Sequence, residues 1–335
     1  MNNYIVPAQW NKHKYTILAW PNNKKIWLED LSIVQKEFVN FCCSLINANE
    51  QLKILVTNNQ TLDEAIKKIS NTKVEYLKIP YGDIWLRDTG PIFAKNLNNK
   101  FVANIFQFNG WGNKYVFKHD NKVATNIANK FKLNILNYNY ILEGGSIESN
   151  GLNTCLTTKQ CLLNKNRNKE LSQNDIEKNL KNMLGFEKIL WLEEGLLNDH
   201  TNGHIDTLAR FVSYSKVVCM RAHYKNDPNF KILKQNSIQL KKFTNASGNR
   251  LEVIEIPSPG IIKNNNGKIM PASFVNFYNA NNAIIMPSFN SHFDEEAMEI
   301  LSKSLNKKII TKSAKAILTG GGTFNCITLE VPIGV

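Results

Sequence analysis

Residues 203–211 read Gly203-His204-Ile205-Asp206-Thr207-Leu208-Ala209-Arg210-Phe211. Two sets of side chains alternate along this stretch, as they do in a β-strand. Such a strand would project His204 and Asp206 from the same face and place an imidazole beside a carboxylate. The pair could equally be structural. A metal pair formed by His200 and His204 is disfavoured, because Asn202 and Gly203 do not favour the helix it would need.

A second segment places two charged residues just before a Gly-Pro pair, which breaks regular secondary structure. Residues 85–91 read Trp85-Leu86-Arg87-Asp88-Thr89-Gly90-Pro91. The Gly-Pro pair predicts that a strand ends here and a loop begins. The segment presents Asp88 beside a large aromatic side chain, and the structural alternative is an Arg87–Asp88 ion pair at a turn.

Two glycine-rich segments complete the set of candidates. Glu143 precedes paired glycines, which allow close backbone approach, so its carboxylate is expected to be held in place rather than solvated. Residues 319–329 place three glycines ahead of Cys326 and then an alternating strand pattern. A lone cysteine is usually a small buried hydrophobic residue. A phosphate-binding loop is disfavoured, because no Lys-Ser/Thr pair and no helix follows the glycines.

The four segments recur at a regular interval. Asp88 and Glu143 are 55 residues apart, Glu143 and His204 are 61 apart, and His204 and Cys326 are 122 apart, which is twice 61. Expected helix starts at 61, 121, 173, 229 and 294 are separated by 52 to 65 residues. This favours an α/β architecture of five pseudo-repeated units over two unrelated domains. Equivalent strand ends would then bring Asp88, Glu143, His204, Asp206 and Cys326 into one pocket.

Hydrophobic periodicity predicts the elements of each unit. Val34, Phe38, Phe41 and Leu45 fall at helical spacing, and Thr61 is expected to cap the next helix. Further helices are expected near 121–133, 173–184, 229–243 and 294–306. Strands are expected at 52–56, 74–79, 101–108, 136–142, 188–192, 204–212, 216–222, 251–256 and 283–286.

The composition is that of an ordinary globular protein of 335 residues, with 43% hydrophobic and 21% charged residues. No linker divides residues 1–335, so one large domain is expected. The net charge is +13, but the basic residues are scattered and no nucleic-acid-binding motif is found, so no nucleic-acid partner is expected. Because no membrane span or secretory leader pattern is found, no membrane partner and a cytoplasmic location are expected. The six cysteines are expected to be free thiols.

The sequence resembles the guanidino-group-modifying superfamily, the penteins, and within it the agmatine deiminases of the bacterial peptidylarginine deiminase type. The motifs that carry the resemblance are WLRDTGP at 85–91, FNGWGNKY at 108–115, EGGS at 143–146, TNGHIDTLARF at 201–211, SFVNFYNANNAIIMPSF at 273–289 and GGGTFNCIT at 320–328. The resemblance implies a five-fold pseudosymmetric ββαβ propeller around a central active site. It also implies hydrolysis of agmatine to N-carbamoylputrescine and ammonia, with no metal or organic cofactor.

The match to the family implies a role for each candidate residue. Cys326 is expected to be the nucleophile, and His204 the general acid and base. Asp88 and Asp206 are expected to bind the two N–H edges of the planar guanidinium. Glu143 is expected to orient the histidine and keep it basic.

Substrate choice is expected to depend on residues around this core. Trp85 and Trp111 are candidate walls for the aliphatic tail of the substrate. Many agmatine deiminases have His where this chain has Asn325 and Asp where it has Asn202, and both departures are expected to affect the pocket wall. Attraction of a dicationic amine to a chain of net charge +13 must be local.

Three alternative functions stay open at the level of sequence. The first is deimination of free or peptidyl arginine, and the second is non-catalytic binding of a guanidine. A pure binding protein would not need the thiol. The third and weaker alternative is a non-hydrolytic amidinotransferase. A homo-oligomer is implied by the family alone.

Overall fold

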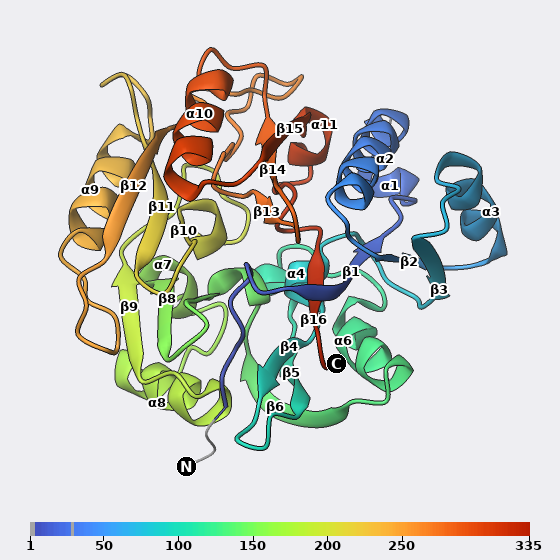
Figure 1. Ribbon diagram of the computed structural model, residues 1–335, viewed down its shortest axis with the longest axis horizontal. Coiled ribbons are helices and arrows are strands. Elements are labelled where there is room, and N and C mark those ends of the chain that lie inside the picture. Colours follow the sequence, from blue (N-terminus) through green and yellow to red (C-terminus); the bar gives the residue numbers. More distant parts are fainter. Residues whose placement is uncertain (1–3, 28–29) are drawn as a thin grey trace.

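The structure is a computed structural model that describes residues 4–27 and 30–335. Within these residues the strands form five small sheets around the centre of the molecule, with helices toward the outside (Figure 1). The chain passes from one sheet to the next in sequence order. The centre is therefore reached by segments from all five sheets.

The strands are short, as expected for a repeat-built fold. They are β1 (His13–Ala19), β2 (Leu52–Val56), β3 (Val74–Lys78), β4 (Ile92–Lys95), β5 (Phe101–Gln107), β6 (Asn134–Ile141), β7 (Glu148–Ser149), β8 (Thr154–Thr158), β9 (Lys188–Leu192), β10 (Ala209–Phe211), β11 (Lys216–Arg221), β12 (Glu252–Pro257), β13 (Tyr278–Asn279), β14 (Ile284–Ser288), β15 (Ile309–Ser313) and β16 (Leu329–Pro332).

The helices range from single turns to the long α2. They are α1 (Lys24–Trp27), α2 (Leu31–Asn47), α3 (Asn59–Lys68), α4 (Leu86–Thr89), α5 (Gly110–Asn113), α6 (Asp120–Lys130), α7 (Lys159–Leu162), α8 (Gln173–Leu184), α9 (Phe230–Leu240), α10 (Asp294–Leu305) and α11 (Lys315–Leu318). Two short 3-10 helices, η2 (Gly144–Ser146) and η3 (Ile205–Thr207), lie near the centre.

Each unit has the same strand arrangement. In the sheet β4-β5-β6, β4 is antiparallel to β5, and β5 is parallel to β6. The sheets β7-β8-β9, β10-β11-β12 and β13-β14-β15 repeat this pattern. A helix connects the two parallel strands in every case, because parallel neighbours need a crossover. The repeating unit is therefore ββαβ.

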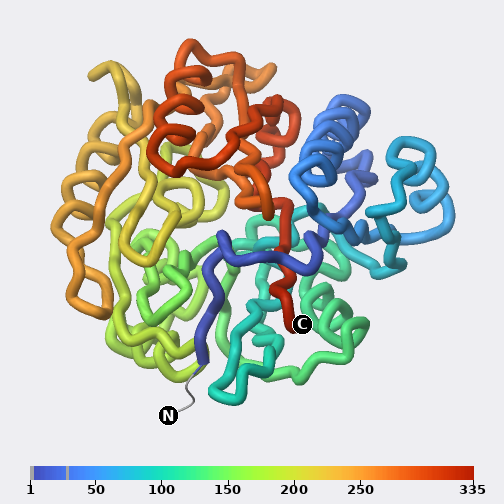
Figure 2. The backbone as a smooth tube through the Cα atoms, viewed as in Figure 1, coloured from blue at the N-terminus to red at the C-terminus, as the bar shows by residue number. Residues whose placement is uncertain are grey.

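The first unit closes the ring with the end of the chain. β16 pairs antiparallel with β1, with Leu329 opposite Ile17, and β1 runs parallel to β2. Figure 2 shows this N-terminal segment crossing the C-terminal strand near the middle of the molecule. β3 is an additional strand at the edge of this sheet. The predicted α/β propeller of five ββαβ units is confirmed.

The predicted helix around Val34, Phe38, Phe41 and Leu45 is found as α2, and these side chains are fully buried against the core. Helix α8 covers the predicted 173–184 and ends at Gly185, whose φ of 79° is the left-handed conformation that favours glycine. The prediction that Thr61 caps α3 is wrong by three residues. Asn58 is the N-cap, and its side chain and that of Thr61 accept each other's backbone N–H groups.

The prediction of a strand over 204–212 is wrong in its first half. Residues 205–207 form η3, and β10 begins at Ala209. Gly203 turns the chain with a φ of 86°. The side chain of Asp199 accepts the backbone N–H groups of Gly203 and His204, which removes these donors from any strand pairing. Residues 86–89, predicted to lie where a strand ends and a loop begins, instead form the single turn α4. No helix in the described ranges 4–27 and 30–335 is long and apolar enough to span a membrane.

Candidate active site

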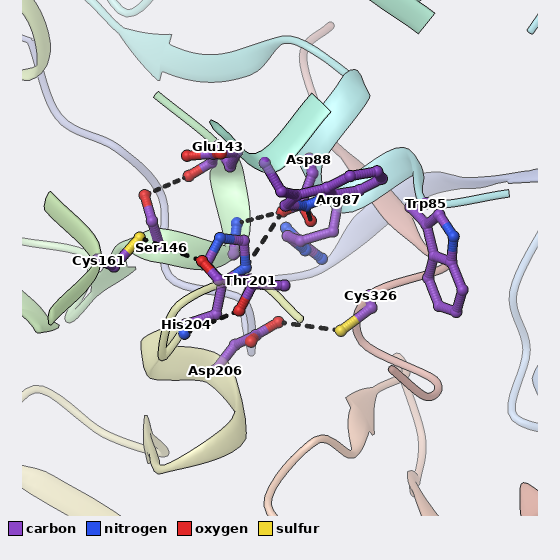
Figure 3. A network of polar contacts seen from close by, with 12 residues as sticks. Trp85, Arg87, Asp88, Glu143, Ser146, Cys161, Thr201, His204, Asp206 and Cys326 are labelled. Atoms are coloured by element: carbon purple, nitrogen blue, oxygen red, sulfur yellow. Dashed lines mark hydrogen bonds and ion pairs between the residues drawn. The ribbon is translucent and has the colours of Figure 1, made fainter. Parts of the chain in front are cut away.

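The site lies where α4, η2, η3 and the segment before β16 meet at the centre of the ring. These elements carry the five predicted residues Asp88, Glu143, His204, Asp206 and Cys326, and all five are buried. Figure 3 shows their side chains gathered in one place although they come from four widely separated segments. The five side chains therefore converge as predicted, but of the five only Asp88 and Cys326 line the pocket that leads to the thiol.

Cys326 lies beside a carboxylate. Its Sγ is 3.6 Å from Oδ2 of Asp206 and 3.4 Å from Oδ1 of Asn276. Burial raises the pKa of the Cys326 thiol well above its usual value, and the charges of Asp206 and Asp88 raise it further. The thiol is therefore protonated at neutral pH.

Asp88 is held by two donors. Its Oδ1 accepts the backbone N–H of Gly145 at 2.9 Å, and its Oδ2 accepts the indole N–H of Trp111 at 2.8 Å. Nδ1 of His204 lies 3.6 Å from Oδ1 of Asp88. Burial raises the pKa of Asp88 to about 6, against the opposing effect of His204.

His204 is fully buried and surrounded by acidic groups. Burial alone would lower its pKa, but the charge of Asp88, with contributions from Cys161 and Glu143, raises the pKa to about 10. The imidazole is therefore protonated at neutral pH. A protonated imidazole can donate a proton to a leaving group.

Gly145 shows how closely three of these side chains approach. A Cβ atom at this position would lie 2.6 Å from Nδ1 of His204, 2.8 Å from Oδ1 of Asp88 and 3.2 Å from Oδ2 of Asp206. Only a residue without a side chain leaves room for the arrangement. The pair of glycines in the EGGS motif thus has a steric reason.

Glu143 is anchored from outside the predicted set. Its Oε1 accepts the Nε–H of Arg167 at 2.8 Å, and both side chains are fully buried. Its Oε2 has no hydrogen-bond partner among the described residues. Glu143 is therefore paired with an arginine. It was expected to orient His204, but the structure shows only that the two side chains lie close together.

Cys161 is a second thiol beside this pair. Ligand atoms of Glu143, Cys161 and His204 all lie within 4.8 Å of one another, the one group among the described residues that could hold a metal ion. The guanidinium of Arg167 already compensates Glu143, which weakens the attraction for a cation there. Burial raises the pKa of Cys161, so this thiol is also protonated.

Asp206 is positioned by a chain of polar contacts. Its Oδ2 accepts from Nδ2 of Asn325 at 2.7 Å, and Oδ1 of Asn325 accepts from Arg87 at 3.4 Å. Arg87 is bound in turn by both carboxylate oxygens of Glu330. The alternative of an Arg87–Asp88 ion pair is therefore wrong. Asn325, which stands where many agmatine deiminases have His, therefore directly contacts Asp206, a residue expected to bind substrate.

Asn202, which stands where many agmatine deiminases have Asp, contacts the side chains that surround the candidate residues. Its Oδ1 accepts from Nη1 of Arg167 at 2.7 Å and from Nζ of Lys114 at 2.9 Å. A carboxylate at this position would compensate two cations where the amide compensates neither. Asn202 therefore affects the arginine that holds Glu143 and not the pocket wall.

A pocket of about 180 Å³ leads to the thiol. Both predicted wall residues, Trp85 and Trp111, line it together with Asp88 and Cys326. Its other lining residues are Ile26, Asp83, Tyr115, Phe117, His200, Thr201 and residues 319–322. No lysine or arginine is among the described residues that line it.

Several functional neighbours were not predicted from sequence. They are Trp27, Asp83, Cys161, Arg167 and Asn276. Asp83 stands two residues before Trp85, and Arg167 is the one arginine between residues 88 and 209, so a local signal existed for these two. The others carry none, because their importance depends on contacts with distant segments.

The profile of the Porphyromonas-type peptidyl-arginine deiminase family matches residues 5–332. The chain belongs to this family. A relative of Mycoplasma capricolum, named "Putative agmatine deiminase", is 33% identical over 98% of this chain and 96% of its own. This confirms the resemblance inferred from the motifs.

Solved structures of the same family match over the whole chain. The agmatine deiminase of Enterococcus faecalis is 26% identical, with a TM-score of 0.93 over 99% of this chain and 97% of its own. A cysteine-to-serine variant of the C. jejuni agmatine deiminase, solved with substrate bound, is 30% identical, with a TM-score of 0.90 over 99% and 97% of the two chains. Family membership and fold thus agree.

Proposed function

We propose that this protein is an agmatine deiminase, which hydrolyses agmatine to N-carbamoylputrescine and ammonia. The observation that carries the proposal is a pocket that ends at Cys326 and is lined by the carboxylates of Asp83 and Asp88 and by aromatic rings, without a lysine or arginine among the described lining residues. Such a pocket suits a cation at both ends of the substrate. The α-carboxylate of free arginine would lack a cationic partner there. The names of the E. faecalis and C. jejuni relatives support the same substrate.

The guanidinium would bind between Asp88 and Asp206. Carboxylates on two of its edges hold the planar cation through charge-assisted hydrogen bonds. Asp206 has a buried oxygen, Oδ1, without a partner among the described residues, and this oxygen is free to accept such a bond. The fixed geometry of both carboxylates presents the guanidinium carbon to the thiol.

Binding would also activate Cys326. Burial and two carboxylates disfavour the thiolate in the free protein. A guanidinium placed between those carboxylates offsets their charge and lowers the pKa of the thiol. The nucleophile is therefore formed when substrate is present, which limits side reactions of the cysteine.

The reaction would proceed in two steps. The Cys326 thiolate attacks the guanidinium carbon and forms a C–S bond, and His204 donates a proton to the departing nitrogen as the C–N bond breaks and ammonia leaves. His204, now neutral, takes a proton from water as the water oxygen attacks the thiouronium carbon. As the C–S bond breaks, the hydroxyl proton of the tetrahedral intermediate passes to the departing sulfur, so that Cys326 returns to the thiol and N-carbamoylputrescine is released. One water is consumed for each ammonia produced.

Ammonia release from agmatine, free arginine and a blocked arginine peptide, measured in parallel, tests the proposal. We expect turnover of agmatine to exceed both others. Equal or greater turnover of either arginine compound would replace the agmatine assignment with arginine or peptidyl-arginine deimination. Absence of turnover with all three would favour a guanidine-binding protein.

Cys326→Ala tests the covalent route. We expect it to abolish ammonia release while agmatine still binds. Cys219→Ala, which removes a buried thiol from β11, is the matched control and should keep full activity. Activity in Cys326→Ala would remove this mechanism.

Two further expectations remain predictions. A homo-oligomer would be detected by light scattering on the purified protein. A cytoplasmic location would be detected by fractionation of the cells that produce it.

A further inference from the structure

Asp83 lies at the pocket and holds two indole rings. Its side chain is 3% exposed. Its Oδ2 accepts the Nε1–H of Trp85 at 2.7 Å, and its Oδ1 accepts the Nε1–H of Trp27 at 3.2 Å and the backbone N–H of Ile84 at 2.9 Å. All these donors are neutral.

A second buried carboxylate stands directly behind it. Oδ1 of Asp120 accepts the backbone N–H groups of Gly82 and Asp83 at 2.7 and 3.3 Å. Its Oδ2 is buried without a hydrogen-bond partner among the described residues. Asp83 thus lines the pocket, and Asp120 adds a second acidic group beside it, outside the pocket lining.

Neither carboxylate has a cationic partner within the described part of the chain. Two other buried carboxylates, by contrast, are paired with arginine, Glu143 with Arg167 and Glu148 with Arg210. Buried charges without a partner are strongly disfavoured. Burial accordingly raises the pKa of Asp83 to about 6 and that of Asp120 to about 7. A cationic ligand would supply the missing charge.

The two indoles connect Asp83 to the thiol. A Cβ on Gly322 would lie 2.8 Å from Sγ of Cys326 and 3.1 Å from Cζ3 of Trp85. A Cβ on Gly320 would lie 2.6 Å from Cζ2 of Trp85 and 2.5 Å from Cη2 of Trp27. The glycine loop therefore packs from the nucleophile along Trp85, which lines the pocket, to Trp27, which does not line it, and the two ring centroids are 6.0 Å apart.

We infer that Asp83, supported by Asp120, determines specificity for substrates with a second positive charge, by attracting the ammonium at the far end of the substrate to the part of the pocket lined by Asp83 and Trp85. The inference rests on the proposed function and names the residues that recognise the ammonium end of agmatine. Indole faces attract cations, and the carboxylate that accepts the N–H edges of the rings adds a negative charge to that attraction. It also explains how a chain of net charge +13 binds a dication.

A purely structural role would not need the charge. An amide at this position would avoid burying an anion, and its single oxygen could keep one of the two indole hydrogen bonds. The test therefore removes the charge while it keeps the shape. Asp83→Asn does so, and agmatine is compared with n-pentylguanidine, in which a methyl group replaces the ammonium.

For the purified full-length protein, kcat and KM are measured with both compounds. We expect Asp83→Asn to raise the KM for agmatine about tenfold and to leave that for n-pentylguanidine within about twofold. Asp120→Asn should act in the same direction with a smaller effect. Equal fold-changes for the two compounds would overturn the inference and leave Asp83 as a structural acceptor.

Controls separate this result from misfolding and from failure of the proposed function. Asp294 is the matched control: at the start of α10 it accepts hydrogen bonds from the hydroxyl of Ser288 and the backbone N–H of Phe289. Asp294→Asn should leave the KM for both compounds unchanged. Circular dichroism checks folding, and if Asp83→Asn does not fold, Asp120→Asn decides. If the wild type turns over neither compound, the proposed function fails. Calorimetry on Cys326→Ala then decides the inference, since equal affinity for the two compounds would overturn it.

Discussion

The indole nitrogen of Trp111 lies 2.8 Å from Oδ2 of Asp88, so a wall residue of the pocket also holds a carboxylate expected to bind substrate. Trp111 has φ and ψ of 53° and 49°, a left-handed conformation that is rare for a bulky residue. Such strain persists where the surrounding structure enforces it, and it is concentrated at functional sites. The backbone of Gly145 holds the other oxygen of Asp88. Asp88 is therefore oriented before substrate arrives.

Replacing Trp111 with Phe should loosen this orientation. The ring remains and the N–H is lost, so we expect the KM for agmatine to rise about tenfold with a smaller effect on kcat, because hydrogen bonds to charged groups contribute ~1.5–3 kcal/mol. Steady-state kinetics measure the split. Trp191→Phe is the matched control, since its indole donates to Glu177 at 2.8 Å on the outer helix α8, and KM should not change. An unchanged KM in Trp111→Phe would contradict the positioning role.

A methyl group at residue 145 should disrupt the centre of the site. In Gly145→Ala the added carbon would lie 2.6 Å from the ring of His204, so His204 and Asp88 must separate. We expect kcat/KM to fall at least ~100-fold, within the range attributed to positioned acid–base catalysis. Gly248→Ala, where no atom lies within 4 Å of the added carbon, should keep its activity despite a φ of 82°. Retained activity in Gly145→Ala would show that the close approach is not required.

Asn325→Asp places a second carboxylate against Asp206. The amide nitrogen of Asn325 now donates to Asp206 at 2.7 Å, and two carboxylates at that distance share a proton. We expect kcat/KM for agmatine to fall about 100-fold, because one edge of the guanidinium loses its charged partner. Thermal melting run alongside the kinetics distinguishes loss of the site from loss of the fold. A variant with wild-type kcat/KM would show that Asn325 does not set the state of Asp206.

Activity should fall on the acid side of neutrality. The pKa of Asp88 is raised to about 6, so this group is an anion above that pH and becomes neutral below it. We expect kcat/KM to decrease as pH falls through about 6, since the neutral acid binds a guanidinium poorly. Asp83 also has a pKa of about 6. The profile is therefore measured between pH 5 and 8 with n-pentylguanidine, which has no ammonium group for Asp83 to attract, so that the change in kcat/KM reports the titration of Asp88. A flat profile over this range would contradict the expectation.

Local sequence was sufficient for much of the fold. The strands at 52–56 and 188–192 occur where alternation and apolar runs predicted them, and α8 ends at the predicted glycine. These features depend on neighbours a few residues apart. The stretch 203–211 was predicted less well, because the side chain of Asp199 competes for its backbone donors.

The sequence by itself determined the five-unit repeat and the convergence of Asp88, His204, Asp206 and Cys326, because the repeat places equivalent segments at one axis. Only the tertiary structure determined which side chains pair with one another. Arg87 contacts Glu330 across 243 residues, and Trp27 contacts Asp83 across 56. Such pairs depend on distances between units in space, and no local pattern of residues encodes those distances.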